Sequence, residues 1–109
     1  MRIYIAGPYT NGDVAVNVRR AIDAADQLIK IGHIPYIPHL THFWHLISPK
    51  EYKFWLWYDK SFLTHWADAV VRLEGDSHGA DGEVELAKRL GITIYYSIFD
   101  IPLGSLEDF

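Results

Sequence analysis

The sequence contains no cysteine, and this absence excludes several kinds of site. Without thiols the chain can form no disulfide framework, no thiolate nucleophile and no cysteine-based metal site. The sequence also lacks any run near the roughly 20 apolar residues that a membrane span requires, and its N-terminal apolar stretch is too short for a signal-peptide core. We therefore expect a soluble, cytoplasmic protein with no membrane partner.

A surplus of positive charge is missing too, because 10 Lys and Arg residues stand against 14 Asp and Glu residues, for a formal net charge of -4. Binding of long nucleic acids depends mainly on neutralising many phosphates with Lys and Arg. The composition therefore argues against a nucleic-acid polymer as partner, while a single nucleotide is compatible with it. With 109 residues and 50% hydrophobic composition, the chain fits one domain spanning residues 1–109.

Short apolar segments alternate with segments of helical periodicity along the chain. Strands are expected at residues 2–6, 34–37, 67–73 and 93–96, and helices at residues 13–31, 49–65 and, after Ser77, up to Leu90. Pro35 and Pro38 place the second strand at an edge of the sheet, because proline cannot donate to the ladder. Residues 39–47 have no clear period and are expected to form a long loop.

This alternation predicts an α/β fold, a three-layer flavodoxin-like or Rossmann-like sandwich with a small parallel sheet of strand order 2-1-3-4. Ligands of such sheets bind beyond the carboxyl ends of the strands where the order reverses, here between the first and third strands. The rule brings together residues 7–10 and residues 74–79. The candidate substrate-binding residues in these segments are Gly7, Pro8, Tyr9, Asp76, Ser77 and Gly79.

The second of these segments runs directly into a helix, so that its backbone N–H groups, the helix dipole and the Ser77 hydroxyl together favour an anion. Glu83 lies about one turn inside that helix. The positive helix end would favour an ionised carboxylate there, which is the useful state of a nucleophile. The alternative is that Glu83 only complements the dipole, as first-turn acids commonly do.

Residues 76–83, D-S-H-G-A-D-G-E, resemble the Ser-x-Gly-x-x-x-Glu signature of the nucleoside 2-deoxyribosyltransferase-like superfamily. Tyr4-Ile-Ala-Gly7 is similar to the first strand and turn of that family, and residues 55–59 followed by 67–71 resemble its block of tryptophan, aspartate and strand. The resemblance covers nearly the whole chain and is nearest to short bacterial and phage members. The family includes transferases that exchange bases between deoxynucleosides and hydrolases that cleave deoxynucleoside 5′-monophosphates, both through a glutamate that forms a glycosyl intermediate.

The resemblance implies that Glu83 is the nucleophile, that Asp59 handles a proton or orients the sugar, and that Tyr4 lies close to the glutamate. It also implies that Ser77 and Gly79 hold the 5′ group, with no cofactor. The chemistry is coherent by itself, since an oxocarbenium-like centre needs one carboxylate and a proton for the leaving group. Hydrolysis is favoured, with base exchange as the alternative and a non-catalytic nucleotide-binding module as the alternative of another class. Asp59 has its own alternative as a charge on the helix surface.

The first turn departs from the phosphate-hydrolysing members of the family. Pro8 and Tyr9 occupy positions where those members tend to carry small and basic residues. The resemblance therefore leaves open whether the substrate carries a 5′-phosphate, and it does not say which base is released.

The region 39–47 is a candidate substrate lid, with Phe43 or Trp44 against the base. His39, His42 and His45 are spaced three apart, and histidine is a common metal ligand. No single helix face would gather all three imidazoles, so a pocket or surface role is favoured and no metal is assigned. A metal-dependent enzyme that uses these histidines is a further alternative.

The helix expected at residues 49–65 carries bulky apolar groups nearly all round. One small sheet can cover only one face of such a helix, and aromatic surface is typical of interfaces. We therefore expect a homodimer or a larger homo-oligomer with this helix in the interface. The family resemblance implies that the tail, residues 97–109, lies near the pocket of a neighbouring subunit.

Overall fold

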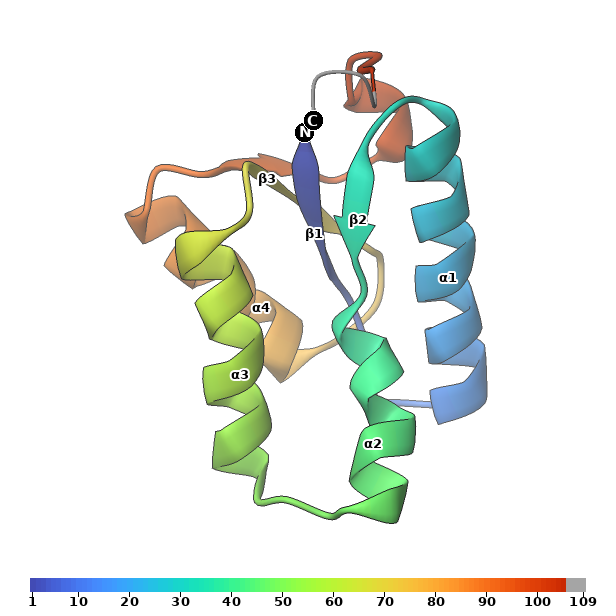
Figure 1. The fold of residues 1–109 in the computed structure, drawn as a ribbon, viewed down its shortest axis with the longest axis vertical. Coiled ribbons are helices and arrows are strands. Elements are labelled where there is room, and N and C mark those ends of the chain that lie inside the picture. Colours follow the sequence, from blue (N-terminus) through green and yellow to red (C-terminus); the bar gives the residue numbers. More distant parts are fainter. Residues whose placement is uncertain (106–109) are drawn as a thin grey trace.

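Four strands form one parallel sheet in the order β2-β1-β3-β4, as the sequence predicts (Figure 1). The structure is a computed structural model and describes residues 1–105. β1 and β3 pair along the centre of the sheet, and β2 forms an edge, as expected from its prolines. The strands are β1 (Arg2–Ala6), β2 (Ile34–Tyr36), β3 (Ala69–Arg72) and β4 (Thr93–Tyr95).

Helices cover both faces of the sheet and complete a three-layer α/β sandwich (Figure 1). Alternate residues of β1 point to opposite faces. Ile3 and Ile5 pack with α1, whereas Tyr4 and Ala6 pack with α3 and α4. Among residues 1–105, no helix is both long and apolar enough to cross a membrane. The helices are α1 (Val14–Lys30), α2 (Thr41–Ile47), α3 (Tyr52–His65) and α4 (His78–Arg89).

Side-chain caps fix where two of these helices begin. Asp13 Oδ1 accepts the N–H of Val16 at 3.1 Å at the start of α1. Ser77 Oγ accepts the N–H of Ala80 at 3.1 Å at the start of α4. Such caps satisfy backbone donors that have no partner inside the helix. The second cap also places the N-terminal end of α4 at the carboxyl edge of the sheet.

Residues 39–47 do not form the long loop expected from the sequence. A 3-10 turn, η1 (Pro38–Leu40), leads into the short helix α2. No side chain of α2 is buried, so its sequence has none of the apolar periodicity of a helix packed on a core. The helix expected from residue 49 begins later, at Tyr52, because the preceding Ser48 donates its N–H to the carbonyl of Trp44 and closes α2.

The C-terminal segment folds back onto the turn between α1 and β2. Pro102 follows the 3-10 turn η2 (Ile98–Asp100), and its carbonyl accepts a hydrogen bond of 2.7 Å from Nε2 of the buried His33. The N–H of Gly104 donates to the carbonyl of Ile31 at 2.8 Å. This turn lies where β2 begins, so the described part of the tail is remote from the carboxyl ends of the strands in its own chain (Figure 1). The rest of the tail expected near a neighbour's pocket, residues 106–109, lies outside the described residues.

The contact between the tail and this turn depends on Gly32. Gly32 has a φ of +90°, and a Cβ there would lie 2.3 Å from the carbonyl oxygen of Gly104, whereas Gly91, with a φ of +72°, has open space around it. We predict that Gly91→Ala lowers the free energy of unfolding by about 1 kcal/mol through backbone strain alone. Gly32→Ala should lower it by clearly more, because the tail must also move. Urea unfolding of both variants checks this, and equal losses would contradict the tail contact.

Candidate functional site

A pocket of about 250 Å³ opens at the carboxyl ends of β1 and β3, where the strand order reverses. This volume lies just below the roughly 300–1,000 Å³ of usual small-ligand sites, so the pocket has room for one small molecule at most. Its walls come from the loop after β1, from η1 and α2, from α3, and from the first turns of α4. The site residues expected from the sequence that line it are Gly7, Tyr9, Asp59, Ser77, Gly79 and Glu83.

Glu83 comes from α4, and strand β1 holds its carboxyl group. The hydroxyl of Tyr4 donates a hydrogen bond to Glu83 Oε2. Tyr4 is 0% exposed at the centre of the sheet, so its ring cannot turn away without opening the core. The structure therefore brings together the two residues that the resemblance places side by side.

Asp59 reaches the same pocket from α3. The hydroxyl of Tyr36, on β2, donates to Asp59 Oδ1 at 3.2 Å. The Tyr36 ring is stacked on Phe62 with centroids 4.0 Å apart and planes 13° apart, which fixes the direction of the hydroxyl. Asp59 is therefore a half-buried pocket residue and not a charge on the surface of its helix.

Tyr4 and Tyr36 are neighbours on adjacent strands and hold the two acids from one side. Their Cα atoms are partners in the register of β1 and β2, and their ring centroids are 5.6 Å apart. Sequence reasoning missed Tyr36, because two residues far apart in the chain can be matched only once the strand register is known. The signal in the sequence is that each of the first two strands carries one tyrosine, and pairing these two strands in parallel would have placed the tyrosines side by side.

Burial, and not the helix dipole, decides the protonation of both acids. It raises the pKa of Glu83 to about 8. It also raises the pKa of Asp59 to about 7, although the hydrogen bond from Tyr36 acts in the opposite direction. This raised pKa opposes the expectation that the helix end keeps the Glu83 carboxylate ionised in the free protein. Burial raises the pKa of Tyr36 as well, so its hydroxyl stays a donor.

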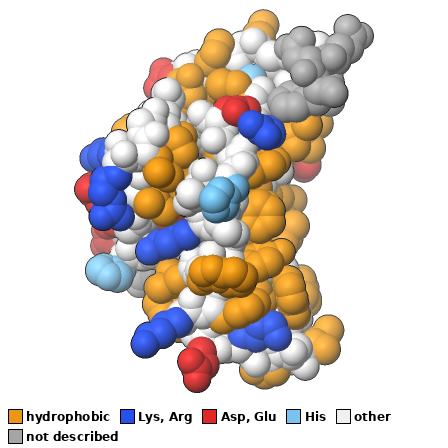
Figure 2. All heavy atoms as spheres, turned by 60° about the vertical axis from the view of Figure 1, so that its left-hand side comes forward, with side chains coloured by type: hydrophobic (Ala, Val, Ile, Leu, Met, Phe, Trp, Pro, Cys, Tyr) orange, Lys and Arg blue, Asp and Glu red, His pale blue; other side chains and the backbone are white. Residues whose placement is uncertain are grey.

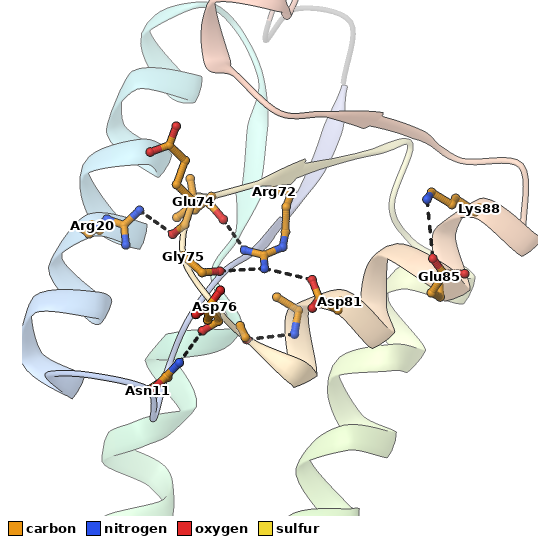
Figure 3. Close-up of polar contacts among 12 residues, drawn as sticks. Asn11, Arg20, Arg72, Glu74, Gly75, Asp76, Asp81, Glu85 and Lys88 are labelled. Carbon is orange, nitrogen blue, oxygen red and sulfur yellow. Dashed lines mark hydrogen bonds and ion pairs between the residues drawn. The ribbon is translucent and has the colours of Figure 1, made fainter.

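An arginine beside the pocket holds the loop between β3 and α4 in place (Figure 3). Arg72, the last residue of β3, donates to the carbonyls of Leu73 and Gly75, the latter at 2.9 Å. Its guanidinium also pairs with Asp81 in the first turn of α4 at 3.1 Å. Since one rigid fork spans strand, loop and helix, the angle between β3 and α4 is constrained.

Two further side chains tie the same loop to the other side of the sheet (Figure 3). Arg20, from α1, donates to the carbonyl of Glu74 at 2.9 Å. Asn11, from the loop before α1, donates to the carbonyl of Asp76 at 2.9 Å. Together with the arginine at the end of β3, these donors satisfy the backbone carbonyls of the loop and so position Ser77 at the start of α4.

Pro8 and Asp76, both expected to bind substrate, lie outside the pocket lining. Pro8 is buried, and a Cβ on Gly75 would lie 2.8 Å from its ring. Asp76 is exposed, and its backbone carbonyl accepts a hydrogen bond from the side chain of Asn11. These residues join the two loops at the end of the sheet and do not face a ligand.

Phe43 and Trp44, expected against the base, are also absent from the lining. The reason is the helical course of α2, which presents Thr41 to the pocket. Phe43 is 66% exposed and lines a separate groove against α1. Trp44 packs edge-on against Trp55 with centroids 5.2 Å apart. An extended loop could have turned these rings inward, whereas the helix places them on its other sides.

Several lining residues had no role in the sequence analysis. Tyr52 and Trp55, on α3, give the pocket aromatic surface on which a flat ligand could stack. Their helix could be predicted, but the side that faces the pocket could not, because nearly every position around it is apolar. The remaining lining residues without a predicted role are Thr10, Pro38, Thr41, Leu56, His78 and Ala80.

The three spaced histidines have separate partners. His39 donates through Nε2 to the carbonyl of Pro8 at 2.9 Å, and burial lowers its pKa. His42 contacts the Tyr9 hydroxyl, and His45 Nδ1 accepts the indole N–H of Trp55 at 2.8 Å. Within residues 1–105, no three side chains of the His, Cys, Asp or Glu types gather in an arrangement that could hold a metal ion. The histidines instead attach η1 and α2 to the rest of the pocket wall.

The fold and the pocket define a small α/β protein with two half-buried carboxyl groups at the switch point of a parallel sheet. Residues 1–97 match the model of a protein family described as a domain of unknown function, DUF7768. The chain belongs to that family. No curated protein matches it.

The buried acid on α4 should make the stability of the free protein depend on pH. The unfolded chain ionises near the ordinary glutamate value of 4.5, whereas folding raises the pKa of Glu83 to about 8. The stability tied to the neutral carboxyl group is therefore fully present below the unfolded pKa and is lost as the pH rises through the folded pKa. Glu83→Gln cannot ionise, so its free energy of unfolding should fall less between about pH 5 and about pH 8.5.

Urea unfolding across this pH range measures the effect. Glu85→Gln is the matched control, because Glu85 lies on the same helix but is exposed. The control should keep the slope of the wild-type protein. A Glu83→Gln profile parallel to that of the wild type would show that the carboxyl group is not buried as described.

Proposed function

We propose that the protein cleaves the N-glycosidic bond of a 2′-deoxynucleoside or its 5′-monophosphate, with water as the acceptor. The observation that carries the proposal is the meeting of Glu83 and Asp59 in one pocket, each hydrogen-bonded to a buried or half-buried tyrosine. Departure of a base leaves an oxocarbenium-like sugar, which needs an anion on one face and a proton for the leaving group. The resemblance of residues 76–83 to the deoxyribosyltransferase-like signature supports the same roles.

In the first step the carboxylate of Glu83 attacks C1′ while the bond from C1′ to the base nitrogen breaks. Asp59 gives its proton to the departing base, and the sugar becomes esterified to Glu83. The reactive form therefore has Glu83 ionised and Asp59 protonated. Because the pKa of Glu83, about 8, lies above that of Asp59, about 7, this form is the minor one of the two singly ionised forms in the free protein. The hydroxyl of Tyr4 stabilises it by donating to the Glu83 carboxylate.

In the second step a water molecule attacks C1′ and the ester bond to Glu83 breaks. Asp59, now a carboxylate, accepts a proton from that water, so both acids return to their starting states. The products are the free base and 2-deoxyribose or its 5-phosphate. A second base that enters in place of water would make the same intermediate serve a transferase. The aromatic surface of Tyr52 and Trp55 can stack on either base.

We predict that Glu83→Gln abolishes base release, because the amide cannot form the glycosyl ester. Asp59→Asn should slow release by about 10²-fold or more, the usual size of general acid–base help. Glu85→Gln should retain the wild-type rate. Chromatography of free base after incubation with the deoxynucleosides and their 5′-monophosphates measures all three variants.

The other outcomes of this assay are equally informative. Near-normal turnover by Glu83→Gln would remove the residue from the mechanism. Release of base that requires a second added base would assign the transferase reaction. Binding of these compounds without release by the wild-type protein would assign a nucleotide-binding module.

We also propose that the chain forms a cytoplasmic homodimer or larger homo-oligomer through α2 and α3. The cysteine-free composition fits the reducing cytoplasm. Large apolar side chains are exposed on both helices, including Ile47 at 86%, Tyr52 at 65% and Trp57 at 66%. Figure 2 shows hydrophobic side chains gathered over much of this side of the molecule, with isolated charged residues between them. Exposed apolar surface of this extent is typical of contact sites between proteins.

Trp57→Glu should convert the assembly into monomers, because it places a charge in the apolar contact. Gln27→Glu adds the same charge to an exposed position of α1, on the opposite face of the sheet, and should leave the assembly intact. Light scattering after size exclusion at micromolar protein concentration measures the mass. A monomeric wild-type protein with full activity would disprove the assembly.

A further inference from the structure

The described lining of the pocket contains acids and aromatic rings but no strongly basic side chain. Among residues 1–105, neither Lys nor Arg lines it, whereas the carboxyl groups of Asp59 and Glu83 do. The imidazole of His39 adds no positive charge, because burial lowers its pKa. His78 is exposed at the rim, where water and salt screen its interactions. The pocket therefore offers little of the counter-charge that a phosphate group needs.

Three cationic side chains on the elements around the pocket have other partners. Arg72 and Arg20 point at the backbone of the loop before α4 and satisfy its carbonyl groups (Figure 3). Lys50 lies over the rings of Trp44 and Phe54, with its ammonium 5.7 Å and 5.3 Å from their centroids. Turning Arg20 into the pocket would break its hydrogen bond to the loop, and turning Arg72 would also break its ion pair with Asp81 and leave the part-buried carbonyl of Leu73 without this donor, which is costly.

The N-terminal end of α4 also attracts negative charge, but this end already has a carboxylate. Asp81 lies in the first turn of α4, where it complements the helix dipole. The Oγ of Ser77 accepts the N–H of Ala80, so its own hydrogen can be donated towards the pocket. One hydroxyl and the backbone N–H groups beside it suit a neutral oxygen, such as the 5′-hydroxyl of a sugar.

We propose that the substrate is the uncharged 2′-deoxynucleoside and that the pocket discriminates against its 5′-monophosphate, an inference that rests on the function proposed above. A phosphate monoester carries a charge of about -1.5 to -2 at pH 7. In this pocket it would face two acidic groups, and Glu83 must ionise for the reaction. The pocket supplies no counter-charge for the buried phosphate, so the monophosphate would bind weakly. Its negative charge would also oppose the ionisation of Glu83 and so suppress the nucleophile.

Isothermal titration of Glu83→Gln, which keeps the shape of the pocket but cannot turn over, tests the inference. Each deoxynucleoside is compared with its own 5′-monophosphate. We expect the dissociation constant of the monophosphate to be at least about tenfold higher. Equal or tighter binding of the monophosphate overturns the inference, while base release by the wild-type protein would still support the proposed function. Failure of both compounds to bind overturns the inference and the proposed function together.

A variant that gains affinity for the monophosphate tests whether missing positive charge causes the discrimination. Thr10 is exposed and lines the pocket on the side of the loop after β1. In the Glu83→Gln background, Thr10→Lys should bring the two dissociation constants to within about threefold of each other, because it supplies the missing charge. Thr10→Gln, similar in length but uncharged, should leave the preference for the nucleoside unchanged. If the lysine variant binds the monophosphate no better than the glutamine variant does, missing charge is not the cause of the discrimination.

Discussion

Two half-buried carboxyl groups lie on the same side of the sheet, and each accepts a hydrogen bond from a tyrosine on a neighbouring strand. A carboxyl group taken out of water loses solvation of its charged form, so such a site is stable only if it stays neutral or gains donors. α3 supplies Asp59, α4 supplies Glu83, and the neighbouring strands β1 and β2 supply the hydroxyl groups. The site therefore exists only when the sheet and the helices of this layer are packed together.

The parts of the fold that could be predicted from the sequence are those with a local periodic pattern. The buried strand around Val70 and Val71 has a continuous apolar run, and Ser77 and Glu83 stand at a loop that enters a helix, where the chemistry of caps and dipoles is general. α2 could not be predicted, because no core contact imposes a period on it. Tyr36 could not be assigned either, since its role comes from strand register.

The protonation of Glu83 cannot be predicted from its neighbours in the sequence. The position of Glu83 near a helix N-terminus suggests an ionised group, yet the surrounding side chains remove water and raise its pKa to about 8. Desolvation acts on the whole charge, whereas the dipole of the helix falls off within its first turn. In the proposed reaction the positive charge that develops on the sugar stabilises the ionised Glu83 carboxylate and so offsets part of this cost.

The anchoring of α2 has a consequence for how a ligand reaches the acids. None of its side chains is buried, and its described contacts are made largely by the Tyr9–His42 pair, the His45–Trp55 hydrogen bond and the ring contacts of Trp44. Segments with few buried apolar contacts open at a small fraction of the free energy of global unfolding. α2 is therefore a part of the pocket wall that can open locally while the sheet stays folded. Such an opening would widen the way to the acids without displacing Tyr4 or Glu83, which lie on β1 and α4.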